Sequence, residues 1–516
     1  MYIYSIASIR NERQKVDEYL ASAAYKEEKT EVTHQFPHSN LNSTIYSTNY
    51  STFYPLINVV LDNTTTTGSK NSVFHWENFY HHEKVSIRKL HNFPLFFAEQ
   101  NIIRIPKKTK YAVMHLIPKK KLKKIHSDIL VAQELCLLFL SQLSSTYYEY
   151  IKEGNLNGWK SLYSPYLRKL LLVEKNTYIL IREALETHLD KGPLIECDYI
   201  DIQGKKSFNY RLGPAYLGKG IDSYELKTDM CRDLYKKRNE SLYTFGESNI
   251  IYNNLIKFYS TITLPTLDDI KYHARGLTEK GYVNKKGKTL KFLNKHAKSY
   301  YTEPNKISFV EDGIEIYKSL TNGGLIIPHI GDERSGGRVT DSLNLMPSWI
   351  RQLITINGER LVECDFSCFH PNIAISLYGG SGEYLTHNDV SEKAGVDISV
   401  VKLAHLKFFN MHPKQMEKSP LFDFYCTNEY EMIKSILRDK NNSEYKYKIT
   451  SMNMFQKEVE IMTEAIRILN SKGIYVGYIY DALLCQPKHL EDVKKAMEEA
   501  AAKFGVKAHP KESMLN

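Results

Sequence analysis

GERLVECDFSCFHPNIAISLYGG, residues 358–380, predicts a short strand that runs directly into a helix. The segment LVECDF (361–366) has a strand-like composition, and the apolar run that follows it has a helical pattern. Asp365 falls at the junction of the two. This stretch therefore predicts a carboxylate at the end of a strand.

A second carboxylate is predicted on a turn near the end of the chain. The segment SKGIYVGYIYDALLCQPKHLEDVKKAMEEAAAKF (471–504) indicates a strand, a tight turn at Asp481–Ala482, a second strand and a helix that begins near His489. Two strand-end aspartates in one sheet could hold paired Mg²⁺ ions, with Mn²⁺ as an alternative, because hard cations prefer carboxylate oxygens and substrate phosphates. Either aspartate alone could equally be a turn residue that makes local hydrogen bonds.

The order of the surrounding segments resembles a known family. The run GGRVTDSLNLMPSWIRQLITINGERLVECDFSCFHPNIAISLYGG (336–380) is similar to the palm of the family A DNA polymerases, the bacterial DNA polymerase I group. That family has a Gly-Arg segment, an Asn-Leu and Pro element, an Ile-Arg pair and a DYSxxELRxxAxxxG motif. The matching residues here are Gly337-Arg338, Asn344-Leu345, Pro347, Ile350-Arg351, Asp365-Phe366-Ser367 and Ile373-Ala374.

Two later segments extend the resemblance, which covers roughly residues 330–510. Residues 451–484 resemble the family's helix with an Asn and a Gln that leads into a His-Asp-Glu strand, and the matching residues are Asn453, Gln456 and Asp481. DISVVKLAHLKFFNM (397–411) resembles the fingers helix, whose lysine binds the incoming triphosphate. Lys402 fits that lysine by its spacing from the helix start, and Lys407 is the alternative.

The resemblance implies a role for each matched residue. Asp365, Asp481 and the backbone carbonyl of Phe366 would hold the catalytic metal ions. Arg338 and Arg351 would bind template or primer phosphates, although Arg351 could instead pair with an acid such as Glu359. Asn453 and Gln456 would contact the minor-groove edge of the primer terminus, or cap a helix.

The departures from the family concern the nucleotide site. Tyr480 and Ala482 replace the His and Glu that flank the second aspartate, and Ile398 replaces the leading Arg of the fingers helix. His370 stands where the family has its ribose-excluding Glu, so it is expected at the nucleotide sugar, with a packing role as the alternative. The resemblance therefore leaves the choice between deoxy- and ribonucleotides open.

The composition is basic and aromatic. The 516 residues include 69 Lys and Arg against 59 Asp and Glu, a formal charge of +10, and contain 37 Tyr and 21 Phe. Cations that meet phosphates and rings that stack on bases suit a nucleic-acid surface, although ordinary solvated faces can have the same composition. The basic segment at 118–126 and the segment at 271–301, which adds Tyr272, Tyr282, Phe292, Tyr300 and Tyr301, are the candidates.

Cysteine usage and hydropathy predict an intracellular protein without a membrane role. Among the seven cysteines only Cys364 and Cys368 are close together, which indicates neither a disulfide framework nor a zinc ribbon. The longest apolar stretch, residues 129–143, contains Gln133 and Glu134 and is predicted to be a buried helix. The expected location is the cytoplasm, or the intracellular site of a mobile element or virus.

We therefore predict an α+β protein with a right-hand, polymerase-like palm and a largely helical N-terminal part. The predicted regions are an irregular, basic region at 1–125, a mostly helical, thumb-like region with a basic nucleic-acid-binding segment at 126–330, and a palm with a small fingers insertion at 331–516. Within the second region, helices are expected from 124 to about 195, with one that opens at Ser127, and a hairpin is expected at 197–212 around Gly204 and Lys205.

The predicted function is template-directed nucleotidyl transfer by a DNA-directed DNA polymerase that uses two Mg²⁺ ions, nucleoside triphosphates and a DNA primer–template. RNA synthesis or priming on the same palm, and RNA as a partner, are the alternatives within this chemistry. A catalytically silent nucleic-acid-binding protein and a metal-dependent nuclease are the alternatives outside it. The sequence does not indicate which proteins the chain binds.

Overall fold

The computed structural model describes residues 101–147, 158–162, 164–171, 173–202, 205–246, 248–284, 287–293, 306–321 and 324–513. These residues form a mixture of helices and sheets, as predicted, and the sheets are antiparallel except for one parallel pair, β7 (Thr289–Lys291) with β8 (Ile307–Phe309). Predictions for residues 1–100, and for Tyr300 and Tyr301, fall outside the described residues.

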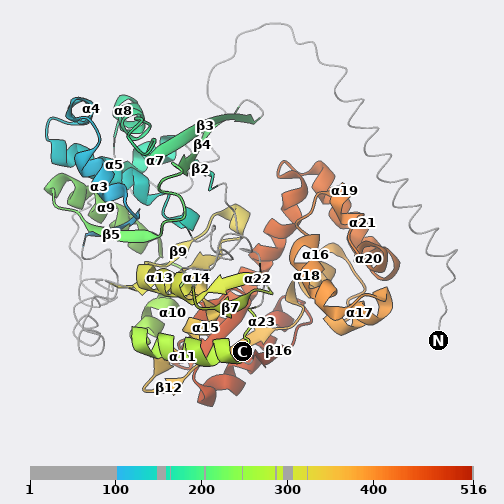
Figure 1. Ribbon diagram of the computed structural model, residues 1–516. Helices are drawn as coiled ribbons and strands as arrows, with labels where there is room; N and C mark the ends of the chain where they lie inside the picture. The colour runs from blue at the N-terminus through green and yellow to red at the C-terminus, as the bar shows by residue number, and fades with distance from the viewer. Residues whose placement is uncertain are drawn as a thin grey trace, which may run out of the picture.

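Residues 101–246 form the N-terminal lobe, which Figure 1 shows in blue and green. Its apolar core extends from Ile103 to Tyr235 and surrounds α5. Strand β1 pairs with β5, and β2, β4 and β3 form a three-stranded sheet. The elements of this lobe are β1 (Ile102–Pro106), α3 (Thr109–His115), α4 (Lys119–Ile125), α5 (Ile129–Ser141), β2 (Lys160–Leu162), α7 (Ser164–Leu171), α8 (Lys175–Leu185), β3 (Ile195–Ile202), β4 (Lys205–Leu212), β5 (Ile221–Glu225) and α9 (Asp229–Gly246).

The local predictions for this lobe hold in most places. The hairpin at 197–212 is confirmed as β3 and β4, and α5 begins one residue later than expected, because the side chain of Asp128 rather than Ser127 accepts the hydrogen bond from the Leu130 amide. Residues 101–125 were predicted to be irregular, but they form β1, α3 and α4. Ile105 and Leu122 bury their side chains in the core around α5, which fixes these short elements.

Helix α5 is the hydrophobic centre of the N-terminal lobe. Among the described residues, the helical stretch Ile129–Tyr147 is the one that is long and apolar enough to cross a membrane, and 72% of it is buried inside the protein. Glu134, in the middle of α5, is fully buried and accepts hydrogen bonds from the Tyr224 hydroxyl and the amides of Lys227 and Thr228. These contacts fit the predicted buried helix.

Residues 250–513 form the C-terminal lobe around a second core, to which Tyr147 and Ile221 of the N-terminal lobe also contribute. The packing therefore changes from one core to the other near residue 250, well before the predicted region boundary at 330. The first part of this lobe contains α10 (Ile250–Tyr259), β6 (Ile262–Thr263), α11 (Leu267–Glu279), β7, β8, α13 (Val310–Thr321), β9 (His329–Ile330), η3 (Glu333–Ser335), β10 (Val339–Thr340), α14 (Ser342–Leu345), α15 (Ser348–Arg351), β11 (Thr355–Ile356) and β12 (Glu359–Arg360).

A four-stranded sheet organises the rest of the C-terminal lobe. Its strand order is β14-β15-β13-β16, so β13 lies between two strands that follow it far along the chain. Helix α23 packs against β13, β15 and β16, and α22 packs against α23 and α10. These elements are β13 (Val362–Phe366), α16 (Phe369–Tyr378), α22 (Ile449–Ser471), β14 (Gly477–Ile479), β15 (Ala482–Cys485), η5 (Pro487–His489), α23 (Leu490–Lys503) and β16 (Pro510–Ser513).

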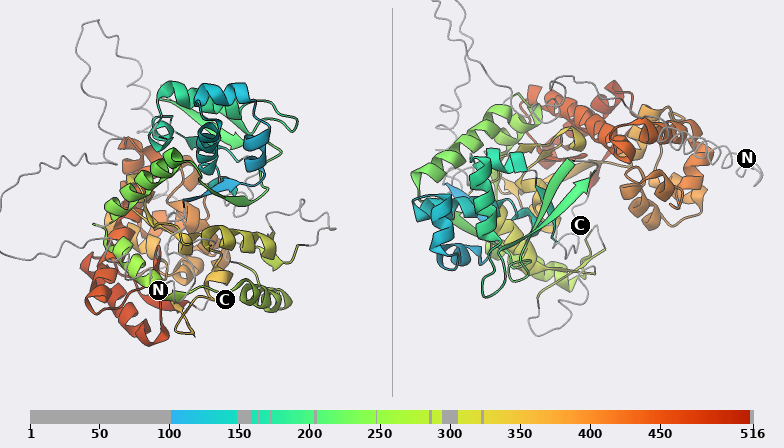
Figure 2. Two further views of the ribbon diagram at one scale, coloured as in Figure 1. Left: turned by 90° about the vertical axis from the view of Figure 1, so that its left-hand side faces the viewer. Right: turned by 90° about the horizontal axis from the view of Figure 1, so that it is seen from above.

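A group of helices inserted between α16 and α22 extends to one side of the sheet, on the right of Figure 1 and again apart from the N-terminal lobe in Figure 2. We call α17 to α21 the inserted helices. Lys440 holds them together at the C-terminal end of α18, where its ammonium group donates hydrogen bonds to the carbonyls of Phe409, Met411 and Tyr447 at 2.7–3.0 Å. These elements are α17 (His387–Ala394), α18 (Ile398–Phe408), α19 (Pro413–Met416), α20 (Phe422–Asn428), α21 (Tyr430–Asn442) and η4 (Lys446–Lys448).

Candidate active site

Asp365 and Asp481 lie at adjoining backbone positions at one end of the four-stranded sheet. Asp365 is opposite Ala482 in the antiparallel pair of β13 and β15, and the amide of Phe366 donates to the carbonyl of Asp481 at 3.3 Å. The expected strand end and hairpin are therefore present, and the two segments meet. Phe366 stacks its ring on Phe369 in the core, so the ring takes no part in the predicted metal contact, which the resemblance assigns to the backbone carbonyl.

The hairpin tip consists of Tyr480 and Asp481, one residue earlier than the predicted turn at Asp481–Ala482. Ile479 pairs with Ala482 and closes a two-residue turn. Tyr480 has a φ of 59°, a left-handed conformation that is uncommon for a bulky residue. Such strain persists only where the surrounding structure imposes it, and it is concentrated at functional sites.

A cluster of charged side chains surrounds this tip. Arg338 donates two hydrogen bonds to Glu458, from Nε to Oε1 at 2.8 Å and from Nη2 to Oε2 at 2.5 Å. His370 Nε2 lies 2.7 Å from Oε2 of Glu458 and 3.3 Å from Nη2 of Arg338. The guanidinium also lies over the ring of Tyr480, 4.9 Å from its centroid. We call Arg338, His370 and Glu458 the charged cluster.

Close backbone packing positions Arg338. Gly336 has a φ of 65°, and a Cβ at this position would overlap the backbone of Phe455 and Gln456 in α22. Glycine therefore lets the loop before β10 lie directly on α22. Arg338, two residues later, lies over the Phe455 ring at 3.7 Å from its centroid and reaches Glu458 one helical turn further on.

The charged cluster changes the acidity of the tip aspartate. Burial, and next the neighbouring carboxylate of Glu458, raise the pKa of Asp481 to about 6, while His370 and Arg338 act in the opposite direction. Burial also opposes ionisation of Glu458, but its hydrogen bonds and ion pairs with His370 and Arg338 outweigh burial and hold its pKa below the ordinary value. Positive partners thus compensate Glu458, whereas burial and Glu458 make Asp481 harder to ionise, an effect that a cation at the hairpin tip would reverse.

Arg351 does not fit the predicted phosphate contact. Its side chain is 8% exposed, and it donates to Glu363 at 3.3 Å and to the Leu343 carbonyl at 3.1 Å. The alternative of an ion pair is the better description, although the partner is Glu363 on β13 rather than Glu359. Arg351 thus holds α15 against the central strand and is not available to a ligand.

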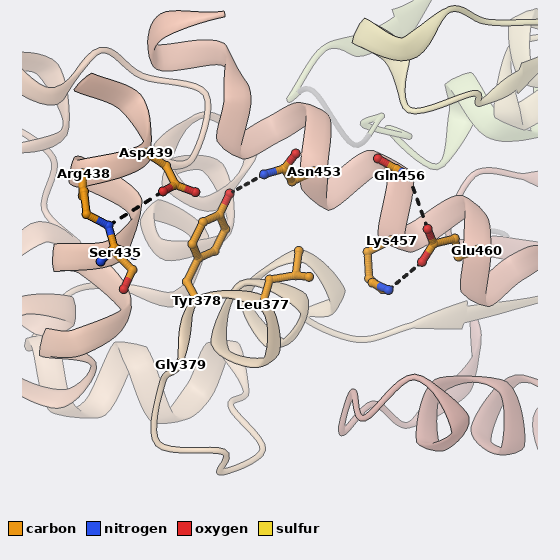
Figure 3. A pocket seen from close by; sticks show the side chains of 10 residues that line it. All are labelled: Leu377, Tyr378, Gly379, Ser435, Arg438, Asp439, Asn453, Gln456, Lys457 and Glu460. Carbon is orange, nitrogen blue, oxygen red and sulfur yellow. Dashed lines mark hydrogen bonds and ion pairs between the residues drawn. The ribbon is translucent and has the colours of Figure 1, made fainter. Parts of the chain in front are cut away.

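Asn453 and Gln456 line a cleft of about 570 Å³ between the end of α16 and helices α21 and α22 (Figure 3). Asn453 donates to the Tyr378 hydroxyl at 3.1 Å, and Gln456 lies 3.5 Å from Glu460. The two residues are three apart, one fewer than in the family's Asn-x-x-x-Gln helix, but they still share one face. The cleft is at the far end of α16 from Asp365, and its charged lining has both signs, with Arg438, Lys457, Asp439 and Glu460.

The two candidate fingers lysines are both exposed on α18. Lys402 lies near enough to His387 to lower the pKa of that imidazole, second in effect to burial. His387 in turn contacts Cys368, three residues after Asp365. This placement links Lys402, rather than Lys407, to the turn that follows Asp365.

In the second basic segment, Tyr272 and Phe292 are exposed, with 79% of the Tyr272 side chain open to solvent, and Tyr282 is partly buried against the core. The first segment forms α4, whose lysines are exposed while Leu122 and Ile125 face the core. Both segments therefore present cations at the surface, as the predicted nucleic-acid contact requires.

Sequence reasoning did not identify Glu458 or Phe455. Glu458 lies in the middle of an amphipathic helix, where a glutamate is ordinarily solvated, and its partners are far away in sequence. One available signal was its apolar neighbourhood, because Ile461, Met462 and Ala465 mark the same helix face as buried.

Comparisons with known proteins give only a distant likeness, to solved structures. No protein-family model and no curated protein matches the sequence. Among solved structures, the polymerase domain of Pol1 from M. smegmatis, in complex with DNA primer-template and dNTP, is similar at 11% identity and a TM-score of 0.31, over 59% of this chain and 76% of that chain. A likeness at this level does not establish a shared fold.

Proposed function

We propose that the protein is a template-directed nucleotidyltransferase, and specifically a DNA polymerase with a family A-like palm. One observation carries the proposal: Asp365 and Asp481, from segments far apart in sequence, adjoin at one end of a central antiparallel sheet. Carboxylates in this arrangement suit phosphoryl-transfer chemistry, in which catalysis is mainly positioning and charge stabilisation.

The donor set fits magnesium. Asp365, Asp481 and the Phe366 carbonyl offer oxygen ligands only, which hard divalent cations prefer over imidazole or thiolate. Burial and the neighbouring carboxylate of Glu458 raise the pKa of Asp481, and a bound cation would offset both effects. When bound, two Mg²⁺ ions would activate the attacking primer oxygen and stabilise the leaving pyrophosphate.

The chain's own residues would position the reactants. Lys402 would reach the triphosphate from α18, since it is exposed and next to the turn that follows Asp365. Arg338 is engaged by both oxygens of Glu458, so we assign it to positioning the hairpin tip in place of the phosphate contact predicted from sequence. His370, the imidazole of the charged cluster, would meet the nucleotide sugar.

Nucleic acid would bind across the exposed basic surface. Asn453 and Gln456 would offer amide donors from the cleft between α16, α21 and α22, and the cations and rings of residues 271–293 would follow a strand of the primer–template. Phosphate contacts of this kind weaken as the salt concentration rises.

The test is extension of a labelled DNA primer–template with Mg²⁺, comparing deoxy- with ribonucleotides. We expect Asp365→Ala and Asp481→Ala each to reduce extension by at least about 1,000-fold, because the phosphate charge is left uncompensated. Asp492→Ala removes an exposed carboxylate of α23 and is the matched control that keeps extension. All variants are compared at equal folded fraction by circular dichroism.

The other outcomes separate the alternatives. Full extension by either aspartate variant would refute the paired role. Incorporation of ribonucleotides in preference would assign RNA synthesis or priming, and cutting of the primer would assign a nuclease. A folded wild type that binds the duplex without extending it would assign a nucleic-acid-binding protein.

A further inference from the structure

Three side chains with metal-binding atoms converge beside the candidate active site. The Sγ atom of Cys368 lies 3.6 Å from Nδ1 of His387, and Nδ1 of His387 lies 3.0 Å from Nδ1 of His405. All three ligand atoms lie within 4.8 Å of one another. Cys368 and His405 are buried, and His387 is partly buried.

The three residues come from three separate elements. Cys368 lies in the turn between β13 and α16, with a φ of 54°, His387 is the first residue of α17, and His405 lies in the last turn of α18. Cys368 is therefore held in an uncommon backbone conformation that directs the chain from the central strand into α16. The cluster joins this turn to the inserted helices.

We propose that Cys368, His387 and His405 form a site for a zinc-type transition-metal ion, distinct from the Mg²⁺ site proposed at Asp365 and Asp481. A thiolate and two imidazoles are ligands that zinc prefers and magnesium does not. With Zn–N of about 2.0 Å and Zn–S of about 2.3 Å, a tetrahedral site separates two nitrogens by about 3.3 Å and a nitrogen from a sulfur by about 3.6 Å. The two observed distances are close to these values.

The protonation of the histidines suits a cation. Burial, followed by the charges of Lys402 and Lys511, lowers the pKa of His387 to about 4, and burial lowers that of His405 to about 3. Both rings are thus neutral near pH 7, and each has one nitrogen with a lone pair. Burial raises the pKa of the Cys368 thiol to about 12, so binding zinc would release a proton from the thiol, as is usual for thiolate ligands.

A second layer of contacts fixes one of the imidazoles. Nε2 of His405 lies 2.7 Å from the hydroxyl of Tyr425, which is fully buried. When the other nitrogen of a histidine binds metal, this type of contact sets the tautomer and the ring orientation. Three protein ligands leave a fourth position, which a water molecule would fill.

Charge around the cluster is mixed. In addition to burial, the positive charges of Lys402 and Lys511 lower the pKa of His387, and they disfavour a cation at the cluster. In addition to burial, the negative charge of Asp389 raises the pKa of Cys368, and it favours a cation there. A zinc ion bound to one thiolate retains a single positive charge, which Asp389 offsets.

The alternative to a bound metal ion is a chain of hydrogen bonds from Cys368 through the two histidines to Tyr425. In that chain the single Nδ1 of His387 serves both Cys368 and His405.

The site would set the distance between two parts of the candidate active site. Cys368 follows Asp365 by three residues, and His405 follows Lys402 by three residues on the same helix. A metal ion held by both would fix α18, and with it Lys402, against the turn after β13. This consequence rests on the proposed function, whereas metal binding itself does not.

The test uses the full chain, stripped of metal by a chelator and titrated with Zn²⁺ and with Co²⁺ in excess Mg²⁺. We expect one equivalent of zinc per chain, a thiolate-to-cobalt charge-transfer band, and a higher melting temperature in the wild type. Cys368→Ala should lose the band, and His405→Ala should weaken zinc binding by at least about 100-fold. Tyr425→Phe, which removes only the outer contact, should weaken it by about 10–100-fold.

Two control variants test whether the metal binds at this cluster and nowhere else in the chain. Cys136→Ala removes an equally buried thiol from the N-terminal lobe and should keep the cobalt band. Asp365→Ala should bind zinc normally even though it does not extend primers, so the failure of one proposal is distinguishable from the failure of the other. No stoichiometric zinc in the folded wild type, or a cobalt band that persists in Cys368→Ala, would overturn the proposal.

Discussion

Glu134 in the N-terminal lobe and Glu458 in the C-terminal lobe are both completely buried, and their partners differ in kind. Neutral groups surround Glu134: the Tyr224 and Thr228 hydroxyls and two backbone amides at the start of α9 donate to it. Glu458 is held by a guanidinium and an imidazole, and a second carboxylate, Asp481, lies nearby.

The difference separates a structural carboxylate from one at a candidate site. Neutral donors satisfy Glu134 and fix α5 to the start of α9. The pairs around Glu458 are costly to desolvate, and replacing such pairs with apolar residues is often neutral or stabilising. A fold has little reason to retain this cluster for stability alone, which points to function.

Among the variants that test this comparison, the largest effect is expected for Glu458→Gln. The change leaves the partly buried Arg338 without its counter-charge, inside a cluster whose Glu458 is fully buried, and should cost about 3 kcal/mol of unfolding free energy. It should also reduce primer extension by about 100-fold, because the hairpin tip moves. Urea unfolding and the extension assay measure the two effects separately.

The double variant Arg338→Met/Glu458→Met is the control for this prediction. It should recover most of the lost stability and none of the extension, because the apolar pair removes the buried charges without restoring the cluster. Recovery of extension would show that the cluster serves stability only, and the contrast with Glu134 would disappear.

Gly336→Ala should have the next largest effect. The new Cβ would overlap the backbone of α22, and the left-handed φ adds strain, so we expect a loss of several kcal/mol together with displacement of Arg338. Gly337→Ala is the matched control, because Gly337 also has a left-handed φ, of 76°, but has open space around it. It should cost only about 1–2 kcal/mol and keep extension, and equal losses in both variants would contradict the role of close packing.

Asp341 provides a third buried carboxylate with neutral donors, the Tyr259 hydroxyl and the Asn344 amide. Burial raises its pKa from 3.8 to about 6. Between these values the native state keeps a proton that the unfolded chain has released, so stability falls as the pH rises through the window. Across this pH window, the unfolding free energy of the wild type should fall by at most about 3 kcal/mol relative to that of Asp341→Asn.

Urea unfolding of both proteins at several pH values between 4.5 and 7.5 measures this difference. Other titrating groups cancel between the two proteins. Asp268→Asn is the matched control, because it makes the same change at an exposed carboxylate. A flat difference for Asp341→Asn would show that burial does not raise its pKa.

The smallest effect is expected for Glu134→Gln. Glutamine keeps the shape and one acceptor oxygen, but its NH₂ group faces donors in place of the second oxygen, so the cost should be about 1–3 kcal/mol. Extension per folded molecule should be unchanged, since the contact lies in the other lobe. A fall in extension at equal folded fraction would give Glu134 a functional role and remove the contrast with Glu458.

Local pattern was sufficient for much of this fold. The strand that ends near Asp365, the hairpin that carries Asp481 and the helix that follows it are all visible as changes from alternating to helical periodicity. The hairpin of β3 and β4 was predictable for the same reason. The errors at Ser127 and at the hairpin tip are single-residue shifts, because neighbouring residues compete for the cap and turn positions.

Long-range pairing was not visible in the sequence. Nothing local indicates that Arg351 meets Glu363 in place of Glu359, or that Glu458 meets Arg338 and His370. No short-spaced motif marks the Cys368 cluster, since its histidines follow at distances set by the inserted helices. The strand and helices of residues 101–125 depend on a core supplied by later residues, chiefly those of α5.

The place of β13 in its sheet has a consequence during synthesis of the chain. Its two neighbours, β15 and β16, both follow it, and β16 ends at Ser513. While the ribosome is still translating the inserted helices and α22, β13 has no partner on either side, although the N-terminal lobe already has its complete core. The strand that carries Asp365 is therefore an unpaired sheet edge in the nascent chain, a segment that chaperones would need to protect until β16 emerges.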